Sequence, residues 1–324
     1  FFIPDARSLW IKPSVKYLVK YLKANPVDAI LTDGPPHTNT VIGTRVSIQT
    51  GIPYLADFQD PWTQVDYYQL FKIGKRADRT HKKLEQETFA VAKKITIASP
   101  TWKNDIETIG AKNVDVIYYG YDEDDFKNLQ AEPDRFFTLT HAGLLGFDRN
   151  PENLFQAMAT LNEEIPGFKE NVRIKLIGQT DLSVMKTIRE FGLDDQIIQI
   201  GTIPRKQVLQ ELVNSWALLL PLNKAANVGG RMPGKFYEYI RSERPILSFG
   251  PQGTDIDRII QEYGLGENFD GIDVKFLQNH LAKLYSEQYL PQNFSAVKSK
   301  KDYSFFSNNN QTKILASFLD EIIL

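Results

Sequence analysis

Short apolar runs alternate with stretches of helical periodicity along most of the chain. In its first part, apolar runs of strand length occur at residues 27–31, 54–58, 94–98 and 113–117. Helical spacing of apolar residues is seen at 14–23, 40–49, 72–92 and 101–109. Because strands and helices alternate, these elements predict a parallel sheet covered by helices on both faces.

The second part repeats the same design after an acidic, aperiodic stretch at 122–135, which we interpret as a linker. Strands are predicted at 136–141, 172–177, 196–200, 217–222 and 245–249. Helices are predicted at 151–161, 182–191, 205–213, 254–262, 275–285 and 311–324, with one more in the segment discussed below. This pattern predicts a second, doubly wound α/β domain.

A chain of 324 residues is long enough for two hydrophobic cores. We therefore expect Rossmann-like domains at 1–130 and 131–305, with a last helix at 306–324, and a ligand between the carboxyl ends of the two sheets. The chain opens at Phe1 without an initiator methionine and passes at once into a helical pattern. We expect the first domain to be incomplete at this end.

Composition narrows the class of function. With 38 basic and 40 acidic residues the formal net charge is −2, which does not favour nucleic acid as the partner. The chain has no cysteine, so disulfides and thiolate metal sites are excluded. It shows neither a signal-peptide pattern nor an apolar stretch near the roughly 20 residues of a membrane span, and we expect it in the cytoplasm.

A glycine-rich loop containing Gly229 and Gly230 follows the apolar run 216–222 and leads into a predicted helix. The helix should begin near Pro233 or Gly234 and end before Pro245. Its buried stripe should consist of Phe236, Tyr239 and Ile240.

Lys235 lies in the first turn of this helix, where its charge opposes the helix dipole. Loop amides, a helix N-terminus and a lysine together favour a bound phosphate, whereas the alternative is a solvated surface lysine. Glu238 shares a face with Lys235 and could accept hydrogen bonds from ribose hydroxyls. Alternatively, Glu238 pairs with Lys235 or Arg241 on the helix surface.

The loop 142–150 is the first turn from strand to helix in the second domain. Gly143 and Gly146 would let the backbone approach a ligand, and Arg149 stands just before the next helix. Arg149 and Lys235 could bind a diphosphate and offset the charge on a leaving nucleotide. The alternative for Arg149 is an ion pair with Asp148 or Glu152.

In the first domain, candidate side chains follow two neighbouring strands. His37 comes after a rigid Gly-Pro-Pro element and is a candidate for binding or proton transfer, or else a structural histidine. Asp57 and Asp60 lie at the end of the next strand and just beyond it, and one of them could instead cap the turn. The acidic clusters at 122–125 and 255–257 have no supporting context, so we expect no metal and no cofactor.

Several motifs, in this order along the chain, resemble bacterial family 4 glycosyltransferases of the GT-B fold. They are Thr32-Asp-Gly-Pro-Pro-His-Thr38, Ala56-Asp-Phe-Gln-Asp-Pro-Trp-Thr63, His141-Ala-Gly-Leu, Asp148-Arg-Asn-Pro151, Gly234-Lys-Phe-Tyr-Glu-Tyr239 and Arg244-Pro-Ile-Leu247. The resemblance covers nearly the whole chain. It implies metal-independent, retaining transfer of a sugar from a nucleotide-sugar donor in a cleft between two Rossmann-like domains, as part of cell-surface glycan synthesis.

The resemblance also implies roles for individual residues. Arg149 and Lys235 match the diphosphate-binding pair, and Glu238 matches the second acid of the family's Glu, seven residues, Glu motif. His37 and Asp60 would face the acceptor and the transferred sugar, and the last helix would cross back to the first domain. The acceptor would be a glycan or a lipid-linked sugar.

The sequence departs from the family at three places. Gly230 occupies the position of the first Glu of the motif, Gln59 replaces a frequent histidine, and the early strands of the first domain do not precede Phe1. Two other functions therefore remain: a non-catalytic module that binds nucleotide sugars, and an epimerase of similar architecture. The stretch from Trp62 to Arg76 predicts either a peripheral contact with a membrane surface or ordinary loop packing.

Overall fold

The protein is described by a computed structural model that covers residues 2–225, 227–271 and 273–324. It consists of two compact units. Unit 1 comprises Phe1–Tyr119, Gly230–Met232 and Asn309–Leu324, and unit 2 comprises Gly120–Gly229 and Pro233–Asn308. The last helix thus belongs to unit 1, and the predicted linker at 122–135 belongs to unit 2.

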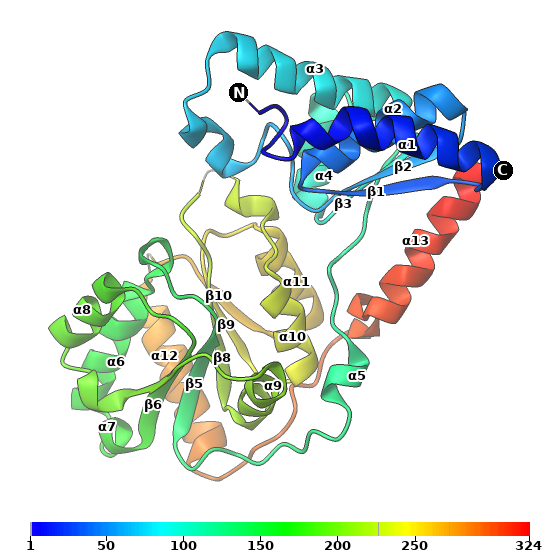
Figure 1. Ribbon diagram of the computed structural model, residues 1–324. Helices are drawn as coiled ribbons and strands as arrows, with labels where there is room; N and C mark the ends of the chain where they lie inside the picture. Colours follow the sequence, from blue (N-terminus) through cyan, green and yellow to red (C-terminus); the bar gives the residue numbers. More distant parts are fainter. Residues whose placement is uncertain (1, 226, 272) are drawn as a thin grey trace. The chain divides into compact units, whose positions relative to one another are not determined.

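Unit 1 is built on a parallel sheet of four strands whose spatial order follows the chain (Figure 1). The strands are β1 (Ile30–Gly34), β2 (Tyr54–Phe58), β3 (Lys94–Ile97) and β4 (Val114–Val116). The helices are α1 (Ile11–Ala24), α2 (His37–Thr50), α3 (Lys75–Val91), α4 (Pro100–Thr108) and α13 (Asn308–Ile323). The predicted helices and strands of this part are confirmed, most of them to within three residues at each end.

The first strand was predicted too early. The apolar pattern indicated 27–31, but β1 begins at Ile30 and continues through Asp33 and Gly34, which were expected in a loop. Pairing with the buried strand β2 sets this register, from Ile30 opposite Tyr54 to Gly34 opposite Phe58. Since a strand is defined by its partner, a local run of apolar residues does not fix its ends.

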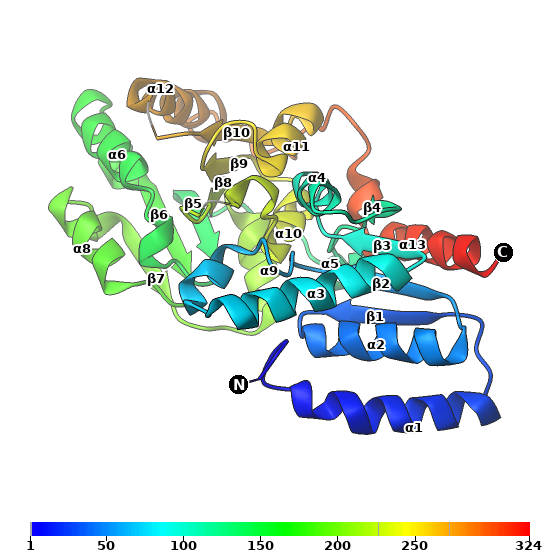
Figure 2. The same ribbon diagram turned by 90° about the horizontal axis from the view of Figure 1, so that it is seen from above.

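The first and last helices of unit 1, α1 and α13, are held by different contacts. Helix α1 packs on α2 and lies on the far side of α2 from β1 (Figure 2). Helix α13 is joined to the sheet by Lys94 of β3, whose buried ammonium forms an ion pair with Glu321 at 2.9 Å. The same ammonium lies 4.6 Å from the ring centre of Phe318.

Unit 2 contains a parallel sheet of six strands in the order β10-β9-β8-β5-β6-β7. The strands are β5 (Phe137–Ala142), β6 (Val172–Ile177), β7 (Ile197–Ile200), β8 (Ala217–Pro221), β9 (Ile246–Phe249) and β10 (Gly266–Phe269). The chain winds from β5 to β7 in one direction and from β8 to β10 in the other. This is the predicted doubly wound topology, and its switch point lies between β5 and β8.

The helices of unit 2 are α5 (Glu123–Phe126), α6 (Glu152–Glu164), α7 (Phe168–Asn171), α8 (Leu182–Glu190), α9 (Arg205–Asn214), α10 (Gly234–Ser242), α11 (Asp255–Tyr263) and α12 (Val274–Leu284). Helix α6 packs on α12 and α9 packs on α10, and Figure 1 shows these two pairs on opposite sides of the sheet. The prediction missed β10 and the short helices α5 and α7, whose four residues are too few to show a period.

Each unit has its own hydrophobic core, formed between its sheet and the helices that pack on it.

Among the described residues, no helix is both long and apolar enough to cross a membrane.

Candidate functional site

Helix α10 supplies the central cation of the candidate site in unit 2. It begins at Gly234, directly after Pro233, and the predicted stripe of Phe236, Tyr239 and Ile240 is buried. The hydroxyl of Tyr239 accepts a hydrogen bond from the backbone N–H of Ala142 at 3.0 Å. This contact joins the middle of α10 to the end of β5.

Lys235 is mostly buried at this junction. Burial, with a smaller contribution from the nearby charge of Arg149, lowers the pKa of Lys235 to about 8. Within the part of the chain that the structure describes, no carboxylate forms an ion pair with its ammonium, and Glu238 acts on it only at longer range. A buried ammonium without a paired anion is costly, and a bound anion would remove that cost.

His141 of β5 is the nearest polar contact of Lys235, and sequence reasoning assigned it no separate role. Its Nδ1 lies 3.1 Å from the carbonyl oxygen of Leu219. Because a carbonyl oxygen can only accept, Nδ1 carries the proton and donates a hydrogen bond to it. Its Nε2 is then an acceptor, 3.4 Å from the Nζ of Lys235. Complete burial lowers the pKa of His141 to about 3, which keeps the imidazole neutral beside the ammonium.

The loop after β5 brings two predicted residues to Lys235. Gly143 has φ +104°, a backbone conformation that favours glycine, and a Cβ there would lie 2.8 Å from the Nζ of Lys235, so the loop backbone closely approaches the ammonium. Arg149 ends a short 3-10 turn and is partly exposed. Its Nε is 3.8 Å from a carboxylate oxygen of Asp148, so the predicted alternative pairing exists but is long and leaves most of the guanidinium available.

Glu238 lies one turn beyond Lys235 on α10, and its side chain is 16 % exposed. It pairs with neither of the predicted partners but with Arg205 of α9, at 2.6 Å. Arg205 also binds Asp125 through two nitrogens. Sequence reasoning missed Arg205, although its position in the first turn of α9, the helix that follows β7, could have indicated a site residue.

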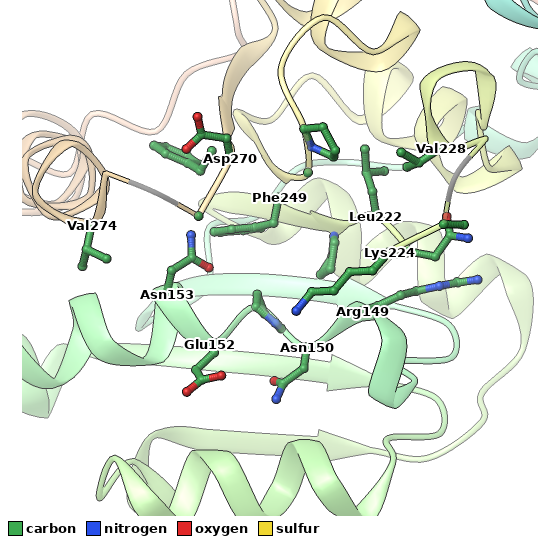
Figure 3. Close-up of a pocket in the computed structure, with 18 of the residues that line it drawn as sticks. Arg149, Asn150, Glu152, Asn153, Leu222, Lys224, Val228, Phe249, Asp270 and Val274 are labelled. Atoms are coloured by element: carbon green, nitrogen blue, oxygen red, sulfur yellow. The ribbon is translucent and has the colours of Figure 1, made fainter.

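A cavity of about 540 Å³ opens beside Arg149, at the carboxyl ends of β5, β8, β9 and β10. Figure 3 shows Leu222, Val228 and Phe249 on one side and Asn150, Glu152 and Asn153 on the other. Lys224, which sequence reasoning also missed, adds a second cation to its lining. The size and mixed lining suit a small polar organic ligand, and the position next to the switch point is usual for such a site.

The predicted residues of unit 1 form a separate group. His37 is the first residue of α2 rather than part of a loop, and its ring stacks on Trp62 with centroids 4.4 Å apart. Burial lowers the pKa of His37 to about 4, so the imidazole is neutral. Its Nδ1 is buried and has no hydrogen-bond partner among the residues that the structure describes.

Carboxylates gather at the ends of β1 and β2. Burial raises the pKa of Asp57 to about 6, although a hydrogen bond from Thr96 opposes the shift. Burial also raises the pKa of Asp60, which Arg231 partly offsets. The amide of Gln59, where the family often has histidine, donates to Asp33 at 3.1 Å.

The two glycines of the loop before α10 end a short 3-10 turn, Val228–Gly230. Gly230 groups with unit 1, where a Cβ would lie 2.3 Å from the Trp102 ring and 2.7 Å from the Ser99 hydroxyl. The position of the family's first Glu is therefore too crowded for a carboxylate side chain. Ala226 of the same loop lies outside the described residues.

The structure thus brings Gly143, Arg149, Lys235 and Glu238 together in unit 2, and it places His37 and Asp60 in unit 1. Their catalytic and binding roles stay predictions. Among the described residues, no group of three or more histidine or carboxylate side chains has the arrangement of a metal site.

No protein-family model and no curated protein matches this sequence. Solved structures do match. HepE of Anabaena, in complex with UDP and glucose, matches with a TM-score of 0.66 and 15% identity over 98% of this chain and 83% of its own. A glycosyltransferase from Rickettsia africae matches with a TM-score of 0.67 and 14% identity, over 100% of this chain and 83% of its own.

Sucrose-phosphate synthase from Thermosynechococcus elongatus matches with a TM-score of 0.60 and 14% identity, over 100% of this chain and 77% of its own. At such low identity these likenesses concern the fold. Together with the two parallel-sheet units, they show that the chain has the α/β fold of GT-B glycosyltransferases.

Proposed function

We propose that this protein is a glycosyltransferase that takes its sugar from a nucleotide-sugar donor. The observation that carries the proposal is Lys235, a buried ammonium at a helix N-terminus with Arg149 beside it and no carboxylate paired to it in the described chain. A diphosphate supplies the missing negative charge, and the cations stabilise it further as the nucleotide leaves. The solved structure of HepE with UDP and glucose, which shares the fold, supports the same class of ligand.

The finer parts of the proposal rest on the motifs. We assign the protein to the bacterial family 4 glycosyltransferases, with retaining, metal-independent transfer to a glycan or lipid-linked acceptor in cell-surface glycan synthesis, carried out in the cytoplasm. Glu238 would accept hydrogen bonds from the ribose, while His37 and Asp60 would face the transferred sugar and the acceptor. Near Gly230, where the family has a carboxylate, backbone amides would replace it.

The test begins with binding. Calorimetry of the protein with UDP, GDP, ADP and CDP should show one nucleoside diphosphate bound clearly more tightly than inorganic phosphate. Incubation with the corresponding nucleotide sugars should then release the nucleoside diphosphate, faster when an acceptor is present. Absence of binding by every nucleotide and nucleotide sugar would reject the proposal.

The crowding at Gly230 favours one second candidate, a module that binds nucleotide sugars without transferring them. This candidate predicts the same calorimetry but no release of nucleoside diphosphate. An epimerase would instead change the sugar without any acceptor, which product analysis would reveal.

A further inference from the structure

The cavity beside Arg149 is separate from the group of residues around Lys235. Its described lining belongs to unit 2 and comes from the start of α6, the ends of β8, β9 and β10, and the start of α12. Arg149 lines it, whereas Lys235, His141 and Glu238 do not. The cavity of about 540 Å³ is therefore a second concave feature that shares Arg149 with the proposed donor site.

The cavity and the donor site also belong to different sides of the sheet. Lys235 and Glu238 are carried by α10, which packs on α9, whereas the cavity is bordered by α6 and α12, which pack on each other. Figure 1 shows these two helix pairs on opposite sides of the sheet. A diphosphate held at the start of α10 would therefore leave the cavity open to another ligand.

Lys224 brings a positive charge into the cavity. It follows β8, and its backbone N–H donates a hydrogen bond to the carbonyl oxygen of Asp148 at 3.1 Å, which holds it beside the loop of Arg149. Figure 3 shows its side chain extending into the cavity. Glu152 also lines the cavity, but within the described chain the ammonium of Lys224 forms no ion pair with it or with another carboxylate. This ammonium is available to an anionic group of a ligand.

Side-chain amides on α6 face the cavity as well. Asn153 and Gln156 lie one turn apart on this helix, and their amides have no hydrogen-bonding partner in the part of the chain that the structure describes. The amide nitrogen of Asn153 lies 4.0 Å from the place that a Cβ would occupy at Gly271, so α6 approaches the end of β10 here. Asp270, next to Gly271, adds an acceptor-only carboxylate to the lining. Amides and a carboxylate together suit the hydroxyl groups of a polyol.

The opposite side of the cavity is apolar. Leu222, Val228 and Phe249 lie there in Figure 3, across from Asn153. Phe249 is only 6% exposed and presents an edge rather than an open ring face. A nucleobase would need an open face for stacking, whereas the C–H groups of a sugar ring can pack on such a wall while its hydroxyls reach the amides.

We propose that this cavity binds a monosaccharide that carries one anionic group, a phosphate or a carboxylate. Lys224 binds the anionic group close to Arg149, and the amides of α6 and the carboxylate of Asp270 bind the hydroxyls. The sugar bound here is a ligand distinct from the nucleotide sugar at Lys235. The inference therefore does not rest on the proposed function.

Calorimetry of the full chain with single sugars is the first test. Glucose 6-phosphate and mannose 6-phosphate carry the phosphate, glucuronate and galacturonate carry the carboxylate, and glucose and inorganic phosphate each supply one part alone. At least one charged sugar should bind about tenfold or more tightly than glucose and than inorganic phosphate, because the ion pair and the hydroxyl contacts act together. Binding by none of the four charged sugars would overturn the proposal, as would equally tight binding of inorganic phosphate.

Variants at two lysines test the role of the cavity. Lys224→Met should weaken binding of the charged sugar by about tenfold or more. Lys206→Met, the same change at an exposed lysine of α9, should leave that affinity unchanged. Asn153→Leu should weaken binding of the charged sugar while it leaves any binding of inorganic phosphate unchanged. Equal losses in the two lysine variants would remove the role of the cavity.

Lys235→Met separates the cavity from the donor site. It should weaken binding of the nucleoside diphosphate and leave the charged sugar bound, whereas Lys224→Met should do the reverse. If the charged sugar binds and no nucleotide does, the proposed function fails and the cavity site stands. Loss of sugar binding in Lys235→Met, or displacement of the sugar by UDP, would assign the sugar to the donor site and overturn the proposal.

Hydrogen–deuterium exchange locates the bound sugar without any variant. The charged sugar should slow exchange in residues 149–156 and 269–275, and it should leave residues 234–242 of α10 unchanged. Protection confined to residues 234–242 would contradict the proposal. Circular dichroism and thermal unfolding of each variant confirm that it is folded.

Discussion

The carboxyl ends of the two sheets carry opposite chemistry. In unit 2 the sheet ends at cations, with the buried ammonium of Lys235 beside Arg149. In unit 1 it ends at carboxyl groups and a neutral imidazole, with the pKa of Asp57 raised to about 6 and that of His37 lowered to about 4. Burial disfavours the charged form in all three titrating groups, but the outcomes differ.

In unit 1, burial keeps His37 neutral and shifts the ionisation of Asp57 up to about pH 6. In unit 2, Lys235 stays protonated below about pH 8, and no carboxylate among the described residues is paired with it. Asp57 is stabilised by its hydrogen bond from Thr96, and His37 by its stacking on Trp62. Among the described residues, the hydrogen-bonding partner of the Lys235 ammonium is the acceptor nitrogen of the neutral His141. These differences support our proposal that the sheet end of unit 2 binds an anion and that the sheet end of unit 1 faces uncharged hydroxyl groups and takes part in proton transfer.

The largest expected effect comes from removing the positive charge of Lys235 in unit 2. Lys235→Met should weaken binding of the preferred nucleoside diphosphate by about a hundredfold, because charge-assisted hydrogen bonds contribute roughly 1.5–3 kcal/mol. The melting temperature should stay level or rise, since a buried cation is lost. Calorimetry and thermal unfolding measure the two effects.

Lys206→Met is the matched control for that variant, because Lys206 is an exposed lysine on α9 of the same unit. It should leave affinity unchanged. Equal losses in the two variants would show that general charge, not the position of Lys235, governs binding.

The next effect concerns the shifted pKa values of His37 and Asp57 in unit 1. The pKa of His37 is lower in the folded state, so its contribution to stability is lost as pH falls from about 6.5 to about 4. The pKa of Asp57 is raised, so its contribution runs the other way and stability is lost as pH rises from about 4 to about 6. In the unchanged protein the two dependences, roughly 3 kcal/mol each, largely cancel.

Single variants should expose each dependence. Asp57→Asn should make the protein less stable on acidification relative to the unchanged protein, and His37→Phe, which retains the stacking, should do the reverse. Denaturant unfolding between pH 4 and 7 gives the free energies. Parallel pH profiles for all three proteins would contradict the two pKa shifts.

A smaller effect is the pH dependence of nucleotide binding in unit 2. Lys235 has a pKa of about 8 in the free protein, and a bound diphosphate requires it protonated. The dissociation constant should thus rise as pH passes 8, by up to about tenfold for each further pH unit. Titrations from pH 7 to pH 9.5 test this, and the slope should vanish in Lys235→Met. A flat profile for the unchanged protein would contradict the assignment.

The smallest effect is expected at Arg205, which is 58% exposed and pairs with Glu238 and Asp125. Arg205→Ala should cost less than about 1 kcal/mol in stability, because solvent screens exposed pairs. If Glu238 accepts from the ribose, the variant should still prefer ribonucleoside over 2′-deoxyribonucleoside diphosphates, and Glu238→Ala should not. Loss of the preference in Arg205→Ala alone would move ribose recognition to the arginine.

Much of the architecture followed from local pattern. Strands β2 and β6 and helix α10 begin and end where periodicity and proline placed them, since burial of one face leaves a direct trace in the order of residues. Strand β1 was misplaced and β10 was missed, because Asp33 and Gly266 enter strands only through pairing with a neighbour. Such pairing joins residues far apart in the chain.

In the candidate site, too, some features could be predicted from the sequence and others depend on the tertiary structure. The sequence by itself determined the alternation of strands and helices, the glycine loops, and a lysine and an arginine at the carboxyl end of the second sheet. Only the tertiary structure decided that His141 contacts Lys235 and that Arg205 forms an ion pair with Glu238. It also decided that the Trp102 ring leaves no room for a side chain at Gly230. Ionisation and ion pairing depend on desolvation and on distances between packed elements, and neither is encoded in the spacing of residues along one helix or strand.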